Sequence, residues 1–373
     1  MSAALRVFVA MADAVPSVAH RATVALLAHL SRNHVEPVVC FLGDGPLLAV
    51  CRDEIRIETI LVPPGGRGAR RDSIEGALRS TRAALVHSIG AGTHLLAGHC
   101  ARRVGLPAVW SQYDSASVGS LLQVRAALAR ARIIFVATPL VEARQRRLNP
   151  WGTPLRLVPP SVRRAGDSRE ARRHRARTAL GLDAGAFAFG WLASTAPAGE
   201  TELALRAAAS VCHARTHARL VVFADPAVPA GVMMGGDLRP LASSLGIEAR
   251  CTVAPAHAGF GLPPAFDALD AAFIASGDTE RVALAPIEAL AAGLPLVAAD
   301  TVPVRDSVTS GRDGVLVPPG DPEGFAAALL SLCDDPEERN RLRAAAEKTA
   351  RDRFDVHDAA KQVAQHYRKA LER

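Results

Sequence analysis

Lysine is almost missing from this sequence. Only Lys348, Lys361 and Lys369 occur among 44 basic residues, so arginine carries nearly all of the positive charge. Together with the abundance of alanine, this indicates a compositional bias of the genome. The net charge of +7 is therefore weak evidence for an acidic partner.

Paired cysteines and long apolar runs are also lacking. The six cysteines follow neither a C-x-x-C pattern nor a metal-ligand spacing, which indicates small buried side chains in a reducing compartment. No stretch reaches the roughly 18 apolar residues of a membrane span. The apolar start, Ala3–Val15, has one arginine in its middle and no basic leader. We expect it to form the first strand of a cytoplasmic domain rather than a signal peptide.

The length of 373 residues exceeds what one hydrophobic core usually holds, and an apolar content of 49% suffices for two. Apolar runs alternate with helical patterns through the first half. We expect strands at 5–10, 37–42, 57–62, 84–87, 108–112, 133–137 and 155–159. This alternation predicts a doubly wound parallel sheet, in which ligands bind at the carboxyl ends of the strands.

The stretch Ser276–Asp300, SGDTERVALAPIEALAAGLPLVAAD, predicts a loop, a short helix and a buried strand. Pro286 is tolerated only in a first helical turn, and Gly293 should end the helix. Glu280 precedes this helix and Glu288 lies inside it. Free N–H groups at the helix start suit a phosphate, and a carboxylate deeper in the helix can accept hydrogen bonds from a ribose diol. Two solvated acids in an ordinary crossover are the alternative for this E-x7-E pattern taken alone.

This stretch, continued by GVLVPPGDPEGFAAALLSLCDDPEERNRLRAAA and RDRF, resembles the C-terminal half of retaining family 4 glycosyltransferases, which have the GT-B fold. The resemblance implies two Rossmann-like α/β domains with doubly wound parallel sheets that face each other across a cleft. It implies an N-terminal acceptor-side domain over 1–162, a linker helix over 163–182 and a C-terminal donor-binding domain over 183–355. A last helix within 356–373 should pack back on the first domain.

The resemblance also implies roles for individual residues. Glu280 is expected to be catalytic, and Glu288 to bind the ribose of the nucleotide. The donor phosphates would be bound near the helix start by Arg281, Val282, Ala283 and Leu284, with Arg305 as a reserve cation. On the acceptor side, His87 matches a catalytic histidine of the family, and Tyr113 and Asp114 follow the next strand. A strand-end residue bonded to backbone is the alternative for His87.

Several donor-site residues of the family are replaced. The Arg and Lys that clamp the diphosphate correspond to Trp191 and Ala198. Three loops are without their usual glycines: Ser17-Val18, Arg281-Val282-Ala283 and Val302-Pro303-Val304 stand there instead. We expect Arg281 to supply the missing charge, because a buried diphosphate needs a cation. No metal or other cofactor is implied, since the helix dipole and cations stabilise the leaving diphosphate.

Two functions follow. The first is a cytoplasmic glycosyltransferase that moves a sugar from a nucleotide-sugar donor to a hydroxyl of a sugar or lipid-linked acceptor, with retention. It would act in polysaccharide, glycolipid or glycoconjugate biosynthesis. The second is a catalytically inactive GT-B protein that serves as a binding or scaffolding subunit. A phosphorylase or a nucleotide-sugar epimerase on the same fold is a third alternative.

The segment 163–182 holds seven arginines against Asp167 and Glu170. A nucleic-acid site would be interleaved with aromatic residues, which this segment lacks, so we expect no specific nucleic-acid partner. A solvated helix face is one explanation of the charge. Peripheral contact with the anionic inner face of a membrane is the other.

Overall fold

The computed structural model describes residues 4–30, 34–113, 127–128, 130–149, 152–161, 168–192, 198–223, 232–233, 236–254, 262–275 and 284–372. The chain divides into two compact units. Unit 1 comprises Met1–Ser161, Ala258–Phe260 and Asp355–Arg373, and unit 2 comprises Val162–His257 and Gly261–Phe354. The last helix of the chain therefore belongs to the same unit as the first strand.

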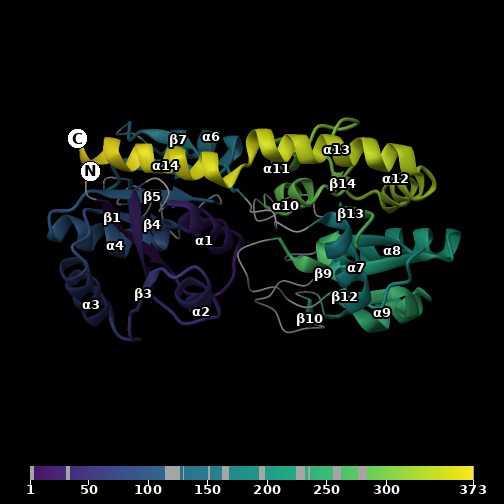
Figure 1. The fold of residues 1–373 in the computed structure, drawn as a ribbon, viewed down its shortest axis with the longest axis horizontal. Helices are drawn as coiled ribbons and strands as arrows, with labels where there is room; N and C mark the ends of the chain where they lie inside the picture. Colours follow the sequence, from purple (N-terminus) through teal and green to yellow (C-terminus); the bar gives the residue numbers. More distant parts are fainter. Residues whose placement is uncertain are drawn as a thin grey trace. The chain divides into compact units, whose positions relative to one another are not determined.

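Unit 1 is built on a seven-stranded parallel sheet in the order β3-β2-β1-β4-β5-β6-β7 (Figure 1). Its strands are β1 (Leu5–Met11), β2 (Val35–Phe41), β3 (Glu58–Leu61), β4 (Leu85–Ile89), β5 (Ala108–Gln112), β6 (Ile133–Val136) and β7 (Leu155–Leu157). This confirms the predicted doubly wound sheet. The strand order reverses between β1 and β4, and ligands bind at the carboxyl ends of strands at such a switch point.

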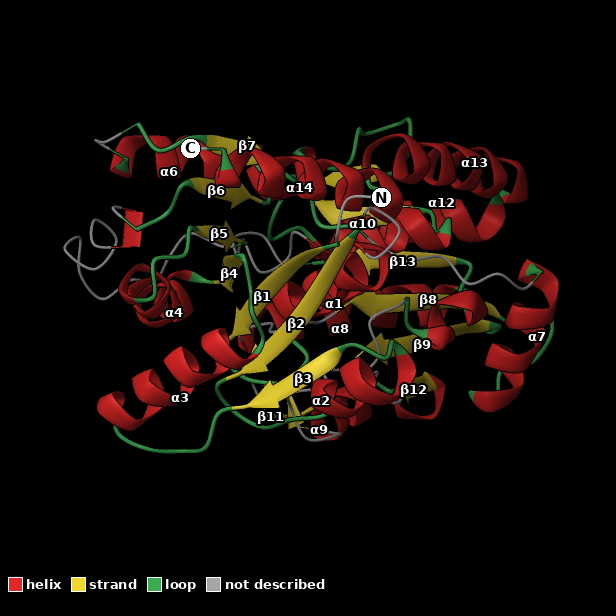
Figure 2. Ribbon diagram, turned by 60° about the vertical axis from the view of Figure 1, so that its left-hand side comes forward, coloured by secondary structure: helices red, strands yellow, loops and turns green. Residues whose placement is uncertain are grey.

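Helices cover both faces of this sheet (Figure 2). They are α1 (Val18–Leu30), α2 (Leu47–Ala49, continued by a π-helical turn over Val50–Glu54), α3 (Arg67–Ser80), α4 (Ala91–Arg103), α6 (Pro139–Leu148) and α14 (Val356–Leu371). Successive side chains of a strand point to opposite faces. Val7 and Val9 of β1 accordingly pack in one cluster with α1 and α14, whereas Phe8 and Ala10 pack in another with α3 and α4.

Unit 2 repeats this strand order in a six-stranded parallel sheet, β12-β9-β8-β13-β14-β15. The strands are β8 (Phe187–Leu192), β9 (Ala218–Phe223), β12 (Cys251–Ala254), β13 (Ala271–Ile274), β14 (Leu296–Ala299) and β15 (Val315–Val317), with a separate hairpin of β10 (Val232–Met233) and β11 (Gly236–Asp237). The switch point of this sheet lies between β8 and β13. Two doubly wound α/β units are therefore present, as the sequence predicts.

The helices of unit 2 are α7 (Arg169–Ala179), α8 (Ala198–Ala214), α9 (Leu238–Ser244), α10 (Leu284–Ala292), α11 (Val302–Arg305), α12 (Pro322–Asp334) and α13 (Pro336–Arg353), with 3-10 turns η3 (Glu248–Arg250) and η4 (Pro264–Ala268). Helices α8 and α12 share a hydrophobic cluster with β8 and β13, and α10 packs against β13, β14 and α13. Helix α7 packs on η4, within the body of unit 2. In the described part of the chain, no helix combines the length and apolarity that crossing a bilayer requires.

Candidate active site

Helix α10 ends as its sequence predicts. The N–H of Gly293 donates to the carbonyl of Leu290 at 3.0 Å, and the N–H of Leu294 donates to that of Ala289 at 2.9 Å. These two bonds form a Schellman motif. Gly293 has a φ of +66°, and a Cβ at this position would lie 2.6 Å from the Glu347 side chain. Glycine is thus needed here for its conformation and for its size.

Glu288 lies in the second turn of α10, and only 6% of its surface is exposed. The described part of this helix runs from Leu284 to Ala292. It follows β13, a strand of the switch point, so its N-terminus lies at the carboxyl edge of the unit 2 sheet. The start of a helix and a buried carboxylate one turn further on are therefore placed where doubly wound sheets bind nucleotides.

The residues that precede α10 are not described by the structure. They include Glu280, Arg281, Val282 and Ala283, and on the acceptor side Asp114 also lies outside the described residues. The roles assigned to these five residues stay predictions from the sequence. Leu284 is the first described residue of α10.

The two residues that the sequence resemblance matches to a diphosphate clamp, Trp191 and Ala198, carry no charge. Trp191 lies on β8 with 1% of its surface exposed, and its ring stacks on Phe273 with 6.5 Å between ring centroids. It belongs to the hydrophobic core between the sheet and α8. Ala198 is the first residue of α8. Any cation for a diphosphate must therefore come from other residues.

Arg305, the reserve cation, forms a two-point ion pair with Asp300 at the end of β14. The Nε–Oδ1 distance is 2.5 Å and the Nη2–Oδ2 distance is 2.7 Å. Hydrogen bonds from Arg305 lower the pKa of the Asp300 carboxyl. The Arg305 side chain is 58% exposed, and exposed ion pairs of this kind contribute little to stability. Its guanidinium can thus exchange the carboxylate for a phosphate at small cost.

His87 lies inside the unit 1 sheet. The expected strand 84–87 would place it at a strand end, but β4 continues to Ile89 because Ser88 pairs with β1 and Ile89 pairs with β5. His87 shares a strand face with Leu85 and Ile89, which pack in the cluster that contains α14. Its imidazole is consequently buried beneath this helix, with 1% of the residue exposed.

Both ring nitrogens of His87 have hydrogen-bond partners. Nδ1 lies 2.7 Å from the hydroxyl of Tyr367 on α14, and Nε2 lies 2.7 Å from the hydroxyl of Ser111 on β5. Burial, and to a lesser degree the neighbouring His94, lowers the pKa of His87 to about 3. The imidazole is therefore neutral at physiological pH and is held in one orientation by two hydroxyl groups.

Tyr113 directly follows β5 and is half-buried against α1. Its hydroxyl lies 3.4 Å from that of Thr23, which donates to the carbonyl of Ala19 at 2.7 Å. Tyr113 thus lies at the carboxyl edge of the sheet, on the strand next to the one that carries His87.

Side chains form hydrogen bonds within the loop between β1 and α1. The hydroxyl of Ser17 accepts a hydrogen bond from the N–H of His20 at 3.2 Å, so it caps the start of α1. Nδ1 of His20 lies 2.8 Å from the carbonyl of Val15 and 3.4 Å from a carboxylate oxygen of Asp13. A side-chain cap therefore satisfies one N–H group of this helix start.

Two parallel α/β units of this kind define the GT-B class of fold, and solved structures agree. The Anabaena protein HepE, solved in complex with UDP-glucose, matches with a TM-score of 0.82 at 16% identity, over 98% of this chain and 100% of that one. A glycosyltransferase from Rickettsia africae ESF-5 matches with a TM-score of 0.82 at 11% identity, over 99% of both chains. At these identities the similarity establishes the fold.

The family match lies in the second half of the chain. Residues 180–349, which lie in unit 2, match the family model "Glycosyl transferases group 1". A D-inositol 3-phosphate glycosyltransferase of Rhodococcus erythropolis is 34% identical over 200 residues, which are 53% of this chain and 45% of the relative. The chain thus matches less than half the length of this curated relative.

Proposed function

We propose that this chain is a retaining glycosyltransferase of the family 4 type, which transfers a sugar from a nucleotide-sugar donor to a hydroxyl acceptor. The observation that carries the proposal is that the family match over 180–349 includes the first turns of α10 and the buried Glu288. Both features lie at the carboxyl edge of the sheet, where doubly wound folds bind nucleotides.

On the donor side, Glu288 accepts hydrogen bonds from the ribose. The backbone N–H groups of Val282, Ala283 and Leu284 face the phosphates, and Glu280 acts at the reacting sugar. Because Trp191 is buried in the core, the positive charge for the diphosphate comes from Arg281, with Arg305 in reserve. Helix dipole and guanidinium then stabilise the leaving diphosphate without a metal ion.

On the acceptor side, His87 acts as a neutral hydrogen-bonding group. A histidine with a pKa of about 3 is a poor general base near neutral pH, because the best base has a pKa near the working pH. Tyr113 and Asp114 lie at the same sheet edge as candidates to contact the acceptor, a sugar or a lipid-linked hydroxyl. The enzyme would work in the cytoplasm, with peripheral contact to the inner face of the membrane, in polysaccharide or glycoconjugate biosynthesis.

The second candidate is a GT-B protein without catalysis that serves as a binding or scaffolding subunit. Two observations favour it. Trp191 at the clamp position is fully within the core, and Arg305 already has a carboxylate partner in Asp300. If Arg281 does not contact the ligand, a bound diphosphate would keep uncompensated charge, which is costly in a cleft.

The test compares the affinities of nucleoside monophosphates and diphosphates by calorimetry. Wild type should prefer the diphosphate, and Arg281→Ala should lose this preference, by roughly 1.5–3 kcal/mol for a charge-assisted hydrogen bond. Glu288→Gln should weaken both nucleotides equally, since both contain the ribose. The matched control is Glu337→Gln, because Glu337 is exposed in the first turn of α13 and should leave both affinities unchanged.

The outcomes separate the two candidates. A diphosphate preference that depends on Arg281, together with sugar transfer in the presence of nucleotide-sugars, supports the enzyme. Nucleotide binding with equal affinity for monophosphate and diphosphate would show that no cation of this chain binds the second phosphate. The non-catalytic binding or scaffolding subunit would then be the better description. If Glu288→Gln binds nucleotides as wild type does, α10 is not the ribose site.

A further inference from the structure

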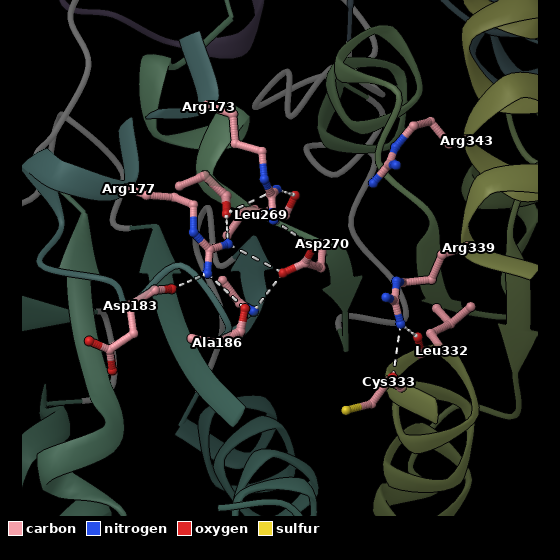
Figure 3. A network of polar contacts seen from close by, with 12 residues as sticks. Arg173, Arg177, Asp183, Ala186, Leu269, Asp270, Leu332, Cys333, Arg339 and Arg343 are labelled. Atoms are coloured by element: carbon pink, nitrogen blue, oxygen red, sulfur yellow. Dashed lines mark hydrogen bonds and ion pairs between the residues drawn. The ribbon is translucent and has the colours of Figure 1, made fainter. Parts of the chain in front are cut away.

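Four arginines lie on two helices near Asp270, which stands just before β13, away from the proposed donor site. They are Arg173 and Arg177 on α7 and Arg339 and Arg343 on α13 (Figure 3). All four belong to unit 2. We call these four residues with Asp270 the arginine cluster.

Arg173 and Arg177 form the structural half of the arginine cluster. Arg177 is 6% exposed and donates to the backbone carbonyls of Ala268, Asp183 and Ala186 at 3.0, 2.6 and 2.7 Å. Its Nη1 also lies 3.4 Å from a carboxylate oxygen of Asp270. These bonds attach α7 to the amino ends of β8 and β13, so this guanidinium has a structural role.

Asp270 is held on several sides. Its Oδ1 accepts from Nη2 of Arg173 at 2.8 Å, and its Oδ2 accepts from the backbone N–H of Ala188 at 2.9 Å, besides the contact with Arg177. Both oxygens of this carboxylate therefore accept hydrogen bonds from groups of α7 and β8. Neither forms an ion pair with the two arginines of α13.

Arg339 and Arg343 extend from α13 toward the side on which Arg173 and Asp270 lie (Figure 3). Nη1 of Arg339 donates to the carbonyls of Leu332 and Cys333, at the end of α12. Arg343 donates to the carbonyl of Gly293 and, at 2.9 Å, to the Asn340 side chain. Among the residues that the structure describes, neither arginine has a carboxylate within ion-pair distance.

The arginine cluster carries more positive charge than its surroundings neutralise. The adjoining arginines are paired: Arg172 lies 3.0 Å from Asp267, and Arg169 lies 3.7 Å from Glu347. The cluster itself has four guanidinium groups and one carboxylate, which leaves three positive charges in excess. Partial burial, and then repulsion from Arg169, Arg173 and Arg339, lowers the pKa of Arg343 to about 10, so it is still charged at neutral pH.

We propose that the arginine cluster is a second anion-binding site, which takes a phosphate group as inorganic phosphate or as a phosphomonoester. Arg339 and Arg343 would donate to the phosphate oxygens, and Arg173 would stabilise its charge from α7. The site goes beyond the proposed sugar transfer, because it lies at the amino ends of β8 and β13, the opposite edge of the sheet from the N-terminus of α10.

The chemistry of the donors selects this ligand. A phosphomonoester carries close to two negative charges at neutral pH and three acceptor oxygens, so it matches an excess of three positive charges better than a single carboxylate does. The planar guanidinium fork suits bidentate contact with phosphate. Arg339 uses only Nη1 in its hydrogen bonds to the described residues, so Nε and Nη2 remain for a ligand.

The experiment measures binding of inorganic phosphate and of glycerol 3-phosphate by calorimetry, at constant ionic strength in chloride. Wild type should bind at least one of them, and Arg343→Gln should weaken that binding about tenfold or more, the range for a lost charge-assisted bond. Comparison of the two probes distinguishes free phosphate from an organic phosphomonoester. Arg343→Lys keeps the charge without the fork and should show an intermediate affinity, which provides a test if the glutamine variant does not fold.

Two arginines serve as controls. Arg341 lies on the same helix, between the two cluster residues, and is paired with Glu338 at 2.6 Å, so Arg341→Gln should bind as wild type does. Arg305→Gln removes a cation from the donor side instead. Binding that falls in Arg305→Gln but not in Arg343→Gln would place the anion at the donor site and overturn the proposal. So would equal binding by Arg343→Gln and Arg341→Gln, or no binding of either probe. None of these results depends on nucleotide binding.

Discussion

Two neutral histidines buried in unit 1 should make this unit sensitive to mild acid. His87 and His94 both have a pKa lowered to about 3, chiefly by burial. In the unfolded chain a histidine has a pKa of about 6.5. Since the folded value lies below the unfolded one, their contribution to stability is complete above pH 6.5 and is lost as the pH falls from 6.5 toward 3.

The magnitude at pH 5 follows from proton linkage. At this pH both imidazoles stay neutral in the folded unit, whereas they are protonated in the unfolded chain. The decrease in the free energy of unfolding therefore depends on the histidine pKa in the unfolded chain, and not on how far below 5 the pKa lies in the folded unit. A gap of 1.5 pH units corresponds to about 2 kcal/mol for each histidine and about 4 kcal/mol for the pair. A typical domain has only about 5–15 kcal/mol of stability in total.

Trp110 provides the assay, because its ring stacks on that of His94 with centroids 5.5 Å apart and an interplanar angle of 8°. In a Trp151→Phe, Trp191→Phe background it is the sole tryptophan of the chain, so urea unfolding followed by its fluorescence reports on unit 1. His87→Gln should remove about half of the stability change between pH 7.5 and pH 5.

The control for this prediction is Tyr367→Phe. It deletes the hydroxyl that lies 2.7 Å from Nδ1 of His87 but keeps both histidines. It should lower the free energy of unfolding by about 1–2 kcal/mol at both pH values and leave the difference between them unchanged. The reasoning would be refuted if His87→Gln retained the whole pH dependence, or if pH 5 cost wild type less than about 1 kcal/mol.

Two further predictions concern the stability of unit 2. Gly293→Ala should lower it by about 1 kcal/mol or more, because alanine is strained at a φ of +66° and its Cβ would displace Glu347; urea midpoints of the two proteins would show this, and an unchanged midpoint would contradict it. Arg177→Gln should cost about 3 kcal/mol or more, since it leaves the backbone carbonyls of Ala268, Asp183 and Ala186 without this donor. Exposed Arg175 on the same helix is the matched control, and equal melting temperatures for Arg177→Gln and Arg175→Gln would contradict the role assigned to Arg177.

The fold could be predicted from the sequence because its signals are local. Apolar runs that alternate with helical patterns predict parallel α/β sheets, and both sheets confirm it. The role of Gly293 as the end of α10 could be predicted because the signal, a glycine between a helical pattern and an apolar strand, lies within a few residues. Helix α6 was missed although Thr138-Pro139 is a start signal, in which the Thr138 hydroxyl accepts from the N–H of Val141 at 3.1 Å.

The environment of His87 could not be predicted in this way. One of its partners, Ser111, lies on a neighbouring strand, and the other, Tyr367, is 280 residues away along the chain. No local pattern specifies such a pair. The end of β4 was placed too early because Ser88 is polar, yet it pairs with β1 as part of the sheet. Glu280 and Arg281 of the donor site lie outside the described residues, so their roles are predicted from the sequence only.

Helix α14 has a consequence for how the protein is made. It supplies Tyr367, Val363 and other core residues to unit 1, yet the ribosome synthesises it after the whole of unit 2. Domains generally fold as units during synthesis. Unit 2 can thus complete its core while translation continues, whereas unit 1, translated first, keeps the apolar surface around His87 uncovered until α14 emerges. Unit 1 is therefore the unit whose folding can be completed only at the end of translation.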